Sequence, residues 1–233
     1  MAPESDERLA QCADVIGHSF ANTALIYEAL VHRSWQAENG EAFSNERLEF
    51  LGDAVLGWAV ADIAFHRLGE SPEGKLTDLR RSVVNMHALS DIAREIGLGD
   101  FILLGKGEDA AGGRDKSSIL ADALEALIGA VYLDGGAQKA FALVERLLAD
   151  SIEAAIPNLE SFDSKTRLQE VCARLGLGAP LYKTEGVGPD HERVFTAHAM
   201  VNGKNIGSGT GRTKKAAEQV AAHVAFESLS DDA

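Results

Sequence analysis

The chain has 233 residues, 45% of them hydrophobic, which suits one large or two ordinary globular domains. Its formal net charge of −14 argues against generic nucleic-acid binding, which usually depends on a basic surface. The acidic start MAPESDERLAQ is unlike a signal peptide, and apolar runs such as VLGWAV are shorter than the roughly 18 residues of a membrane span. We expect no membrane attachment.

The charge is distributed unevenly along the chain. The first 157 residues carry 26 acidic and 13 basic side chains, a net charge of −13, whereas the rest carry 10 and 9, a net charge of −1. This difference predicts an acidic domain followed by a nearly neutral one. The stretch AIPNLESFDS is typical of a linker, so we expect domains over 1–155 and 163–231 with a linker over 156–162. Cys12 and Cys172 form no C-x-x-C pattern, which is typical of reduced thiols in a cytosolic protein.

The first domain is predicted to be all-α, because apolar positions recur at helical spacing and turn-forming sequences are sparse. The segment 45–68 is apolar nearly all round, which is typical of a helix at the centre of a domain. A second such segment is SSILADALEALIGAVYLDGG. Ser117 or Ser118 can cap its start, and Gly135–Gly136 can end it.

The pattern changes after the linker. KTRLQEVCARLG predicts a short amphipathic helix, and YKTEGVG, RVFTAHAMV and KNIGSGT alternate like strands. The middle strand places Phe195, Ala197, Ala199 and Val201 on one face. TKKAAEQVAAHVAFESL predicts a closing helix with a stripe of Ala and Val. The order α-β-β-β-α predicts a small sheet with two helices on one face, so the chain is multidomain.

Acidic residues are embedded in both apolar helices of the first domain. A helix turns about 100° per residue, so Glu46, Glu49 and Asp53 share one narrow face, as do Asp122 and Glu125. Buried carboxylates without partners are unfavourable, so a compensating group is expected. A hard divalent cation such as Mg²⁺ takes oxygen ligands, and an open Mg²⁺ site suits phosphodiester hydrolysis.

Other interpretations of these acids are possible. A single E-x-x-E pair is more often a solvated face or half of a salt bridge, but two pairs on two apolar helices fit that explanation less well. Arg47 lies about 100° from Glu46, off the acidic face. Di-iron bundles use Glu-x-x-His, which is missing at both places. Gly52 costs about 1 kcal/mol in a helix relative to Ala. It indicates tight helix packing, a close symmetric partner or a close substrate backbone.

The block NERLEFLGDAVL, with VHRSW at 31–35 and ILADALEALIGAVYLD at 119–134, resembles the bacterial ribonuclease III family. The resemblance covers nearly the whole chain, because the C-terminal part resembles a double-stranded-RNA-binding domain. It implies a homodimeric endonuclease that cleaves double-stranded RNA with Mg²⁺, for which Mn²⁺ would substitute. Products with 5′-phosphates and short 3′ overhangs are implied. So are a cytoplasmic location and the processing of ribosomal RNA precursors and messenger RNAs.

The same resemblance implies roles for particular residues. The metal-binding active site would be formed by Glu49, Asp53, Asp122 and Glu125, with Glu46 and Glu73 as further acids of the catalytic valley. Asp53 and Glu125 would carry most of the catalysis. Phe50 would insert into the partner subunit. None of these acids is replaced, which indicates an active nuclease.

The segment GTGRTKKAAEQVAA at 209–222 indicates a phosphate site by itself. Lys214 and Lys215 fall in the first turn of the closing helix, which Thr213 can cap, and cations at this position oppose the helix dipole. Three glycines precede the helix. A helix N-terminus with two lysines can bind phosphate, although ordinary surface lysines are the alternative.

Duplex RNA is recognised mostly by its shape, through minor-groove hydroxyls and the phosphates between them. The resemblance implies contacts from the first helix of the domain, from the GPDH loop and from the start of the closing helix. The residues concerned are Thr166, Gln169, Glu170, His191, Thr213, Lys214 and Lys215. Binding without strong sequence preference is expected, and the nearly neutral charge of the domain predicts a modest, salt-sensitive affinity.

Two other functions compete with the nuclease hypothesis. A non-catalytic RNA-binding or ribosome-associated protein would have no use for five carboxylates facing an anionic duplex. A metal–carboxylate enzyme acting on small molecules is disfavoured by the attached RNA-binding domain.

Overall fold

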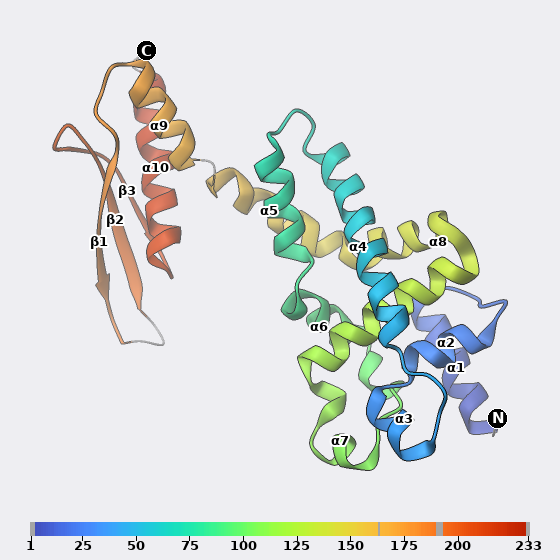
Figure 1. Ribbon diagram of the computed structural model, residues 1–233. Helices are drawn as coiled ribbons and strands as arrows, with labels where there is room; N and C mark the ends of the chain where they lie inside the picture. Colours follow the sequence, from blue (N-terminus) through green and yellow to red (C-terminus); the bar gives the residue numbers. More distant parts are fainter. Residues whose placement is uncertain (1–2, 163, 190–192, 232–233) are drawn as a thin grey trace. The chain divides into compact units, whose positions relative to one another are not determined.

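The computed structural model describes residues 3–162, 164–189 and 193–231 (Figure 1). The chain divides into two compact units, Met1–Ala155 and Ile156–Ala233. The all-α fold predicted for the first domain and the α-β-β-β-α order predicted for the second are both confirmed. Within the described ranges, no helix is both long enough and apolar enough to cross a membrane.

The first unit is built from helices joined by short turns. Its elements are α1 (Pro3–Ile16), α2 (Thr23–Leu30), α3 (Arg33–Asn39), α4 (Glu46–Arg67), α5 (Glu73–Val83), α6 (Met86–Glu95), η1 (Leu98–Asp100), α7 (Lys106–Ala110), η2 (Gly113–Asp115) and α8 (Ser117–Phe162). An isolated parallel bridge between Val31 and Leu103 fixes the start of α3 against the segment that leads to α7.

Helix α4 is buried along one side and carries exposed aromatic side chains on others. Leu56, Ala59 and Val60 are completely buried in the unit. On other sides of the helix, however, Phe50 is 82% exposed and Phe65 is 65% exposed. The prediction of a central helix therefore holds for one side of α4, and the chain by itself leaves aromatic side chains of this helix in solvent.

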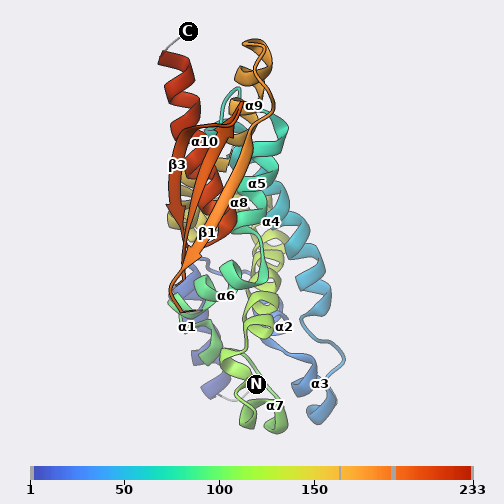
Figure 2. The same cartoon turned by 90° about the vertical axis from the view of Figure 1, so that its left-hand side faces the viewer.

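Helix α8 lies against α4 (Figure 2). Their backbones come into contact at a pair of glycines, one on each helix. A Cβ atom on Gly52 would lie 1.7 Å from the carbonyl oxygen of Glu125. A Cβ atom on Gly129 would lie 2.4 Å from the carbonyl oxygen of Leu48. Tight helix packing thus explains Gly52, and this contact brings the acidic segments of the two helices together.

The predicted end of the second apolar helix is a kink. Gly136 has φ 79° and ψ 178°, outside the helical region, but helix resumes after it and continues to Phe162. Asp134, just before the kink, accepts hydrogen bonds from the backbone N–H of Asn22 at 2.8 Å and pairs with His18 at 2.9 Å. Residues 156–162, predicted as a linker, are helical and form the last turns of α8.

The second unit contains α9 (Ser164–Arg174), β1 (Leu181–Val187), β2 (Val194–Val201), β3 (Lys204–Gly211) and α10 (Lys214–Asp231). The strands form an antiparallel sheet in the order β1-β2-β3, and both helices lie on the same face of it (Figure 1). Ala197, Ala199 and Val201 of β2 are buried against these helices, and Phe195 packs half-buried beside them, as predicted.

Three glycines on alternate positions of β3 let the strand approach α10 closely. A Cβ atom on Gly207 would lie 2.4 Å from the carbonyl oxygen of Ala221, and one on Gly209 would lie 2.5 Å from the nitrogen of Ala221. A Cβ atom on Gly211 would lie 2.7 Å from the nitrogen of Ala217. These glycines therefore serve packing. The predicted Ala and Val stripe of α10 is only partly buried, because its alanines face β3 whereas Val220 and Val224 remain exposed.

Replacing Gly129 by Ala should destabilise the first unit. The added methyl group meets the backbone of α4, which cannot move as a side chain can, so we expect a loss of about 2 kcal/mol or more in unfolding free energy. Urea unfolding followed by tryptophan fluorescence measures this unit alone, because Trp35 and Trp58 are the two tryptophans of the chain.

Gly74→Ala is the matched control for this substitution. Gly74 also lies in a helix, α5, but a Cβ atom there has no neighbour within 4 Å. The control should be neutral or stabilised by up to about 1 kcal/mol. Equal unfolding midpoints for the two variants would contradict a tight crossing of α4 and α8.

Candidate active site

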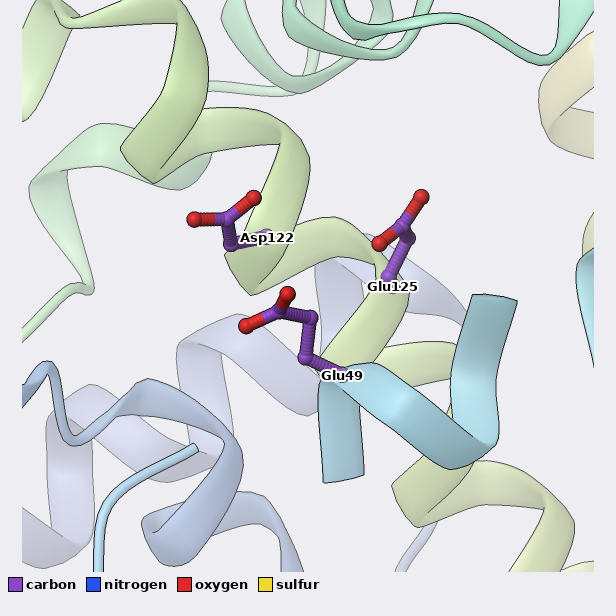
Figure 3. Close-up of side chains that lie close together, drawn as sticks. All are labelled: Glu49, Asp122 and Glu125. Carbon is purple, nitrogen blue, oxygen red and sulfur yellow. The ribbon is translucent and has the colours of Figure 1, made fainter. Parts of the chain in front are cut away.

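Acidic side chains from α4 and α8 meet where these helices touch. Glu49 lies on α4, and Asp122 and Glu125 lie one helical turn apart on α8. One carboxylate oxygen from each of the three residues lies within 4.8 Å of the other two (Figure 3). All three side chains are half-buried. The structure thus brings together three of the acids that the sequence singled out.

The burial and mutual repulsion of these acids change their protonation. Burial raises the pKa of Glu125 to about 8, with further contributions from the charges of Asp53, Asp122 and Glu49. Burial also raises the pKa of Glu49, and the charges of Asp122, Glu46 and Asp53 raise it further. Burial raises the pKa of Asp122 as well. Without a cation, the cluster therefore retains protons that isolated carboxylates release.

The other predicted acids lie outside this cluster. Asp53 and Glu46 are exposed on α4, and they act on the cluster through their charges. Ser44 donates a hydrogen bond to Glu46 at 2.8 Å. Glu73 begins α5 and accepts a hydrogen bond from the Thr77 hydroxyl at 2.6 Å. Among the described residues, the group able to share one ion contains neither Asp53 nor Glu73.

A cation at the edge of the cluster was not predicted from the sequence. Arg33 is exposed at the start of α3, and its charge opposes the rise in the pKa of Asp122. His32 accepts a hydrogen bond from the Ser34 N–H at 3.2 Å, and the Ser34 hydroxyl accepts one from the Gly105 N–H at 2.9 Å. These bonds anchor α3. Arg33 belongs to the motif VHRSW, but the motif alone does not show that this arginine lies near Asp122.

The candidate RNA contacts of α9 lie on the surface of the second unit. Thr166, Gln169 and Glu170 are all exposed. Their spacing along α9 places them on neighbouring turns of one side of the helix. His191, the candidate from the GPDH loop, lies outside the described residues.

The start of α10 has the predicted form. The Thr213 hydroxyl accepts a hydrogen bond from the Ala216 N–H at 3.1 Å, so Thr213 caps the helix. Lys214 and Lys215 occupy the first turn and are exposed. The helix start therefore presents two cations and backbone N–H groups together, an arrangement that suits a phosphate group.

Comparisons with known proteins agree with this architecture. The family model for Ribonuclease-III-like proteins matches residues 22–152, and that for the double-stranded RNA binding motif matches residues 164–229. Ribonuclease 3 of Streptomyces coelicolor is 53% identical over 207 residues, which are 89% of this chain and 75% of that protein. Ribonuclease 3 of Thermobifida fusca is 52% identical over 205 residues, which are 88% of this chain and 85% of that protein.

A solved ribonuclease III nuclease domain is also similar in structure to this chain. The nuclease domain of ribonuclease III from Campylobacter jejuni is 40% identical, with a TM-score of 0.57, and the match covers 60% of this chain and 95% of that one. The matches and the fold define a two-domain protein with a helical, acid-bearing unit and a double-stranded RNA binding motif. The chain belongs to the ribonuclease III family.

The metal-free protein should lose stability as the pH rises towards 9. The pKa of Glu125 is raised from 4.5 to about 8 by folding, so between these values the folded state holds a proton that the unfolded state releases. The stability that depends on this proton is present below about pH 4.5 and is lost as the pH passes 8. Glu125→Gln removes this titration. In EDTA, its advantage in Tm over the unmodified protein should grow by a few degrees between about pH 6 and 9.

Glu145→Gln provides the control for these thermal melts. Glu145 is exposed on the same helix, so this variant should follow the unmodified protein at every pH. A difference between Glu125→Gln and the unmodified protein that stays constant with pH would mean that Glu125 is not held protonated by the cluster.

Proposed function

We propose that this protein is an endoribonuclease that cleaves double-stranded RNA by metal-assisted phosphodiester hydrolysis. The observation that supports this proposal most directly is the meeting of Glu49, Asp122 and Glu125 within 4.8 Å. Half-buried carboxylates this close repel one another, and a divalent cation removes that repulsion. Oxygen donors alone suit a hard ion, so Mg²⁺ is the proposed cofactor, and Mn²⁺ would substitute for it.

Each acid would have its own part in this site. Glu49, Asp122 and Glu125 would hold the metal, with Asp53 completing the set from the exposed edge of α4. Metal in such a site supplies an activated water and stabilises the leaving oxygen. Asp53 is exposed, so it can contact the attacking water and substrate directly. Glu46 and Glu73 would line the groove. Arg33 would attract a phosphate to an otherwise anionic surface.

The second unit would bring duplex RNA to this site. Thr166, Gln169 and Glu170 of α9 would contact the minor groove, and the loop that contains His191 would contact a second one. Thr213, Lys214 and Lys215 would bind the phosphates between them. The family match to the double-stranded RNA binding motif over residues 164–229 supports this assignment.

Further properties follow from the proposed activity. Products would carry 5′-phosphates and short 3′ overhangs, because two sites in a homodimer would cut the two strands at staggered positions. Precursors of ribosomal RNA and structured messenger RNAs are the proposed substrates, and the cytoplasm is the proposed location. Membership of the ribonuclease III family supports these assignments.

Cleavage of a long duplex RNA tests the proposed activity. The unmodified protein should produce short duplexes with Mg²⁺ and none with EDTA. Glu125→Gln should reduce the cleavage rate by about 100-fold or more, because it removes a charged ligand from the proposed site. The same variant should still retard the duplex on a native gel, because the second unit is unchanged.

Glu145→Gln is the matched control for cleavage. It makes the same chemical change on the same helix at an exposed position away from the cluster, so it should cleave at the unmodified rate. Binding without cleavage under every condition would reject the enzyme and favour a non-catalytic RNA-binding protein. Cleavage in EDTA would reject the metal-assisted mechanism.

We propose that the homodimer forms through α4. Phe50, 82% exposed, lies on the same side of this helix as Ala54, Gly57 and Ala61. These small residues help to line a hollow of about 440 Å³ between α4 and α5. A two-fold axis beside the helix would place Phe50 of each chain over the hollow of the other chain. The related Campylobacter jejuni domain is described as having a region involved in dimer formation.

Two variants of α4 test this dimer. Phe50→Ala removes the protruding ring, and Gly57→Leu fills the hollow, where an added Cβ meets nothing within 4 Å in the single chain. Both should weaken dimerisation by about 30-fold or more, as expected for a central aromatic anchor. Sedimentation velocity over a range of concentrations measures the dissociation constant.

Leu181→Ala serves as the control for the dimer measurement. Leu181 is also a large exposed apolar residue, but it lies on β1 of the second unit. This variant should associate like the unmodified protein. A dimer that is unaffected by both α4 variants would show that the chains associate through another surface.

A further inference from the structure

Four side chains of the second unit connect α9, β1 and α10. Lys165 of α9 forms an ion pair with Glu218 of α10. The Thr184 hydroxyl on β1 donates a hydrogen bond to the other carboxylate oxygen of Glu218 at 3.1 Å. The Lys165 ammonium group lies 4.5 Å from the ring centroid of Tyr182, also on β1. Both oxygens of Glu218 are therefore engaged by different elements of the unit.

The contacts of Glu218 keep it ionised. The ion pair with Lys165 and the hydrogen bond from Thr184 lower the pKa of Glu218, and the charges of Lys165 and Lys214 contribute as well. Lys214 precedes Glu218 by one helical turn, so the two side chains are neighbours on α10. Glu218 is thus the anion between a lysine of α9 and a lysine at the start of α10.

This cluster lies between two proposed RNA contacts. Lys165 directly precedes Thr166, which begins the minor-groove contacts of α9. Lys214 begins the proposed phosphate site of α10. A protein that recognises duplex RNA by its shape needs a fixed spacing between its groove and phosphate contacts. The Lys165–Glu218 pair joins the two contact regions where each begins.

We infer that Glu218 is a positioning residue for RNA binding, which sets the α9 contacts relative to the Lys214–Lys215 phosphate site. This inference rests on the proposed binding of double-stranded RNA. Glu218 need not touch RNA to act in this way. It would hold the first turn of α9 in place through Lys165.

A role in overall stability explains the arrangement less well. The side chains of Lys165 and Glu218 are 30% and 24% exposed, and ion pairs that water reaches contribute little to folding stability. The unit already has a buried core between the sheet and its helices, formed by residues such as Leu168, Ala199 and Ala221. Loss of the pair should therefore leave the unit folded while the first turn of α9 shifts.

Binding of the full-length chain to a labelled RNA duplex in EDTA tests the inference without cleavage. Glu218→Gln keeps an acceptor for Thr184 but removes the charge. We expect about 10-fold weaker binding with little change in the far-ultraviolet circular dichroism or Tm. Lys165→Met should weaken binding similarly, and the double variant should be no worse than either, because both remove one pair. Lys165→Arg, which keeps the pair, should bind like the unmodified protein.

A second double-mutant cycle, between Glu218 and Gln169, separates a positioning role of Glu218 from a role in stability. Gln169→Ala should weaken binding in the unmodified protein but much less in the Glu218→Gln background, where α9 is already misplaced. The dependence of affinity on salt should stay the same in Glu218→Gln, because the lysines of α10 still contact phosphate. Glu227→Gln, the same change at an exposed position of α10, should leave affinity unaltered.

Several results would overturn the inference. These are unmodified affinity in both Glu218→Gln and Lys165→Met, an equal effect of Gln169→Ala in both backgrounds, or loss of affinity only in parallel with unfolding. If the unmodified protein itself fails to bind duplex RNA, the proposed function falls and this inference falls with it. Binding by the unmodified protein with no effect of the variants overturns the inference alone.

Discussion

The contact between the backbones of α4 and α8 is the constraint on which the first unit depends. Gly52 and Gly129 let the helices approach so closely that Glu49, Asp122 and Glu125 must share one small volume. Burial, with a further contribution from the neighbouring acidic charges, raises the pKa of Glu125 to about 8, so the packing works against the ionised form of this acid. The same arrangement becomes favourable once a divalent cation is present. The packing that disfavours the ionised acids would therefore also favour the binding of a divalent cation between them.

The second unit uses small residues in a similar way for a different purpose. Glycines on alternate positions of β3 bring the strand against the alanines of α10, which fixes the helix on the sheet. The start of α10 can then present Lys214 and Lys215 at a defined place. The nearly neutral charge of this unit contrasts with the acidity of the first, so a few placed cations, not a generally basic surface, would hold an RNA duplex.

Helical and strand periodicity predicted most of the fold and the acidic faces of the two apolar helices, because both depend on side-chain spacing along the chain. The role expected of each acid came from the family resemblance. That spacing does not show how deeply a side chain is buried or how closely two helices pack. A helical wheel placed Asp53 beside Glu49, but only the structure shows that Asp53 stays exposed at the edge of the cluster. Likewise, three uses of Gly52 were compatible with the sequence until the position of α8 was known. Arg33 was missed because its neighbour Asp122 is distant in sequence.

Metal binding by the isolated protein shows whether the acidic cluster of α4 and α8 exchanges a proton for a cation. Calorimetric titration with Mn²⁺ near neutral pH, in buffers of different ionisation enthalpy, measures the protons released on binding. We expect release of up to about one proton at neutral pH, because metal would displace the proton held by Glu125, and much less near pH 9. Glu125→Gln should release none. Binding with no proton release, or no binding to the unmodified protein, would show that the cluster does not exchange a proton on Glu125 for a metal ion.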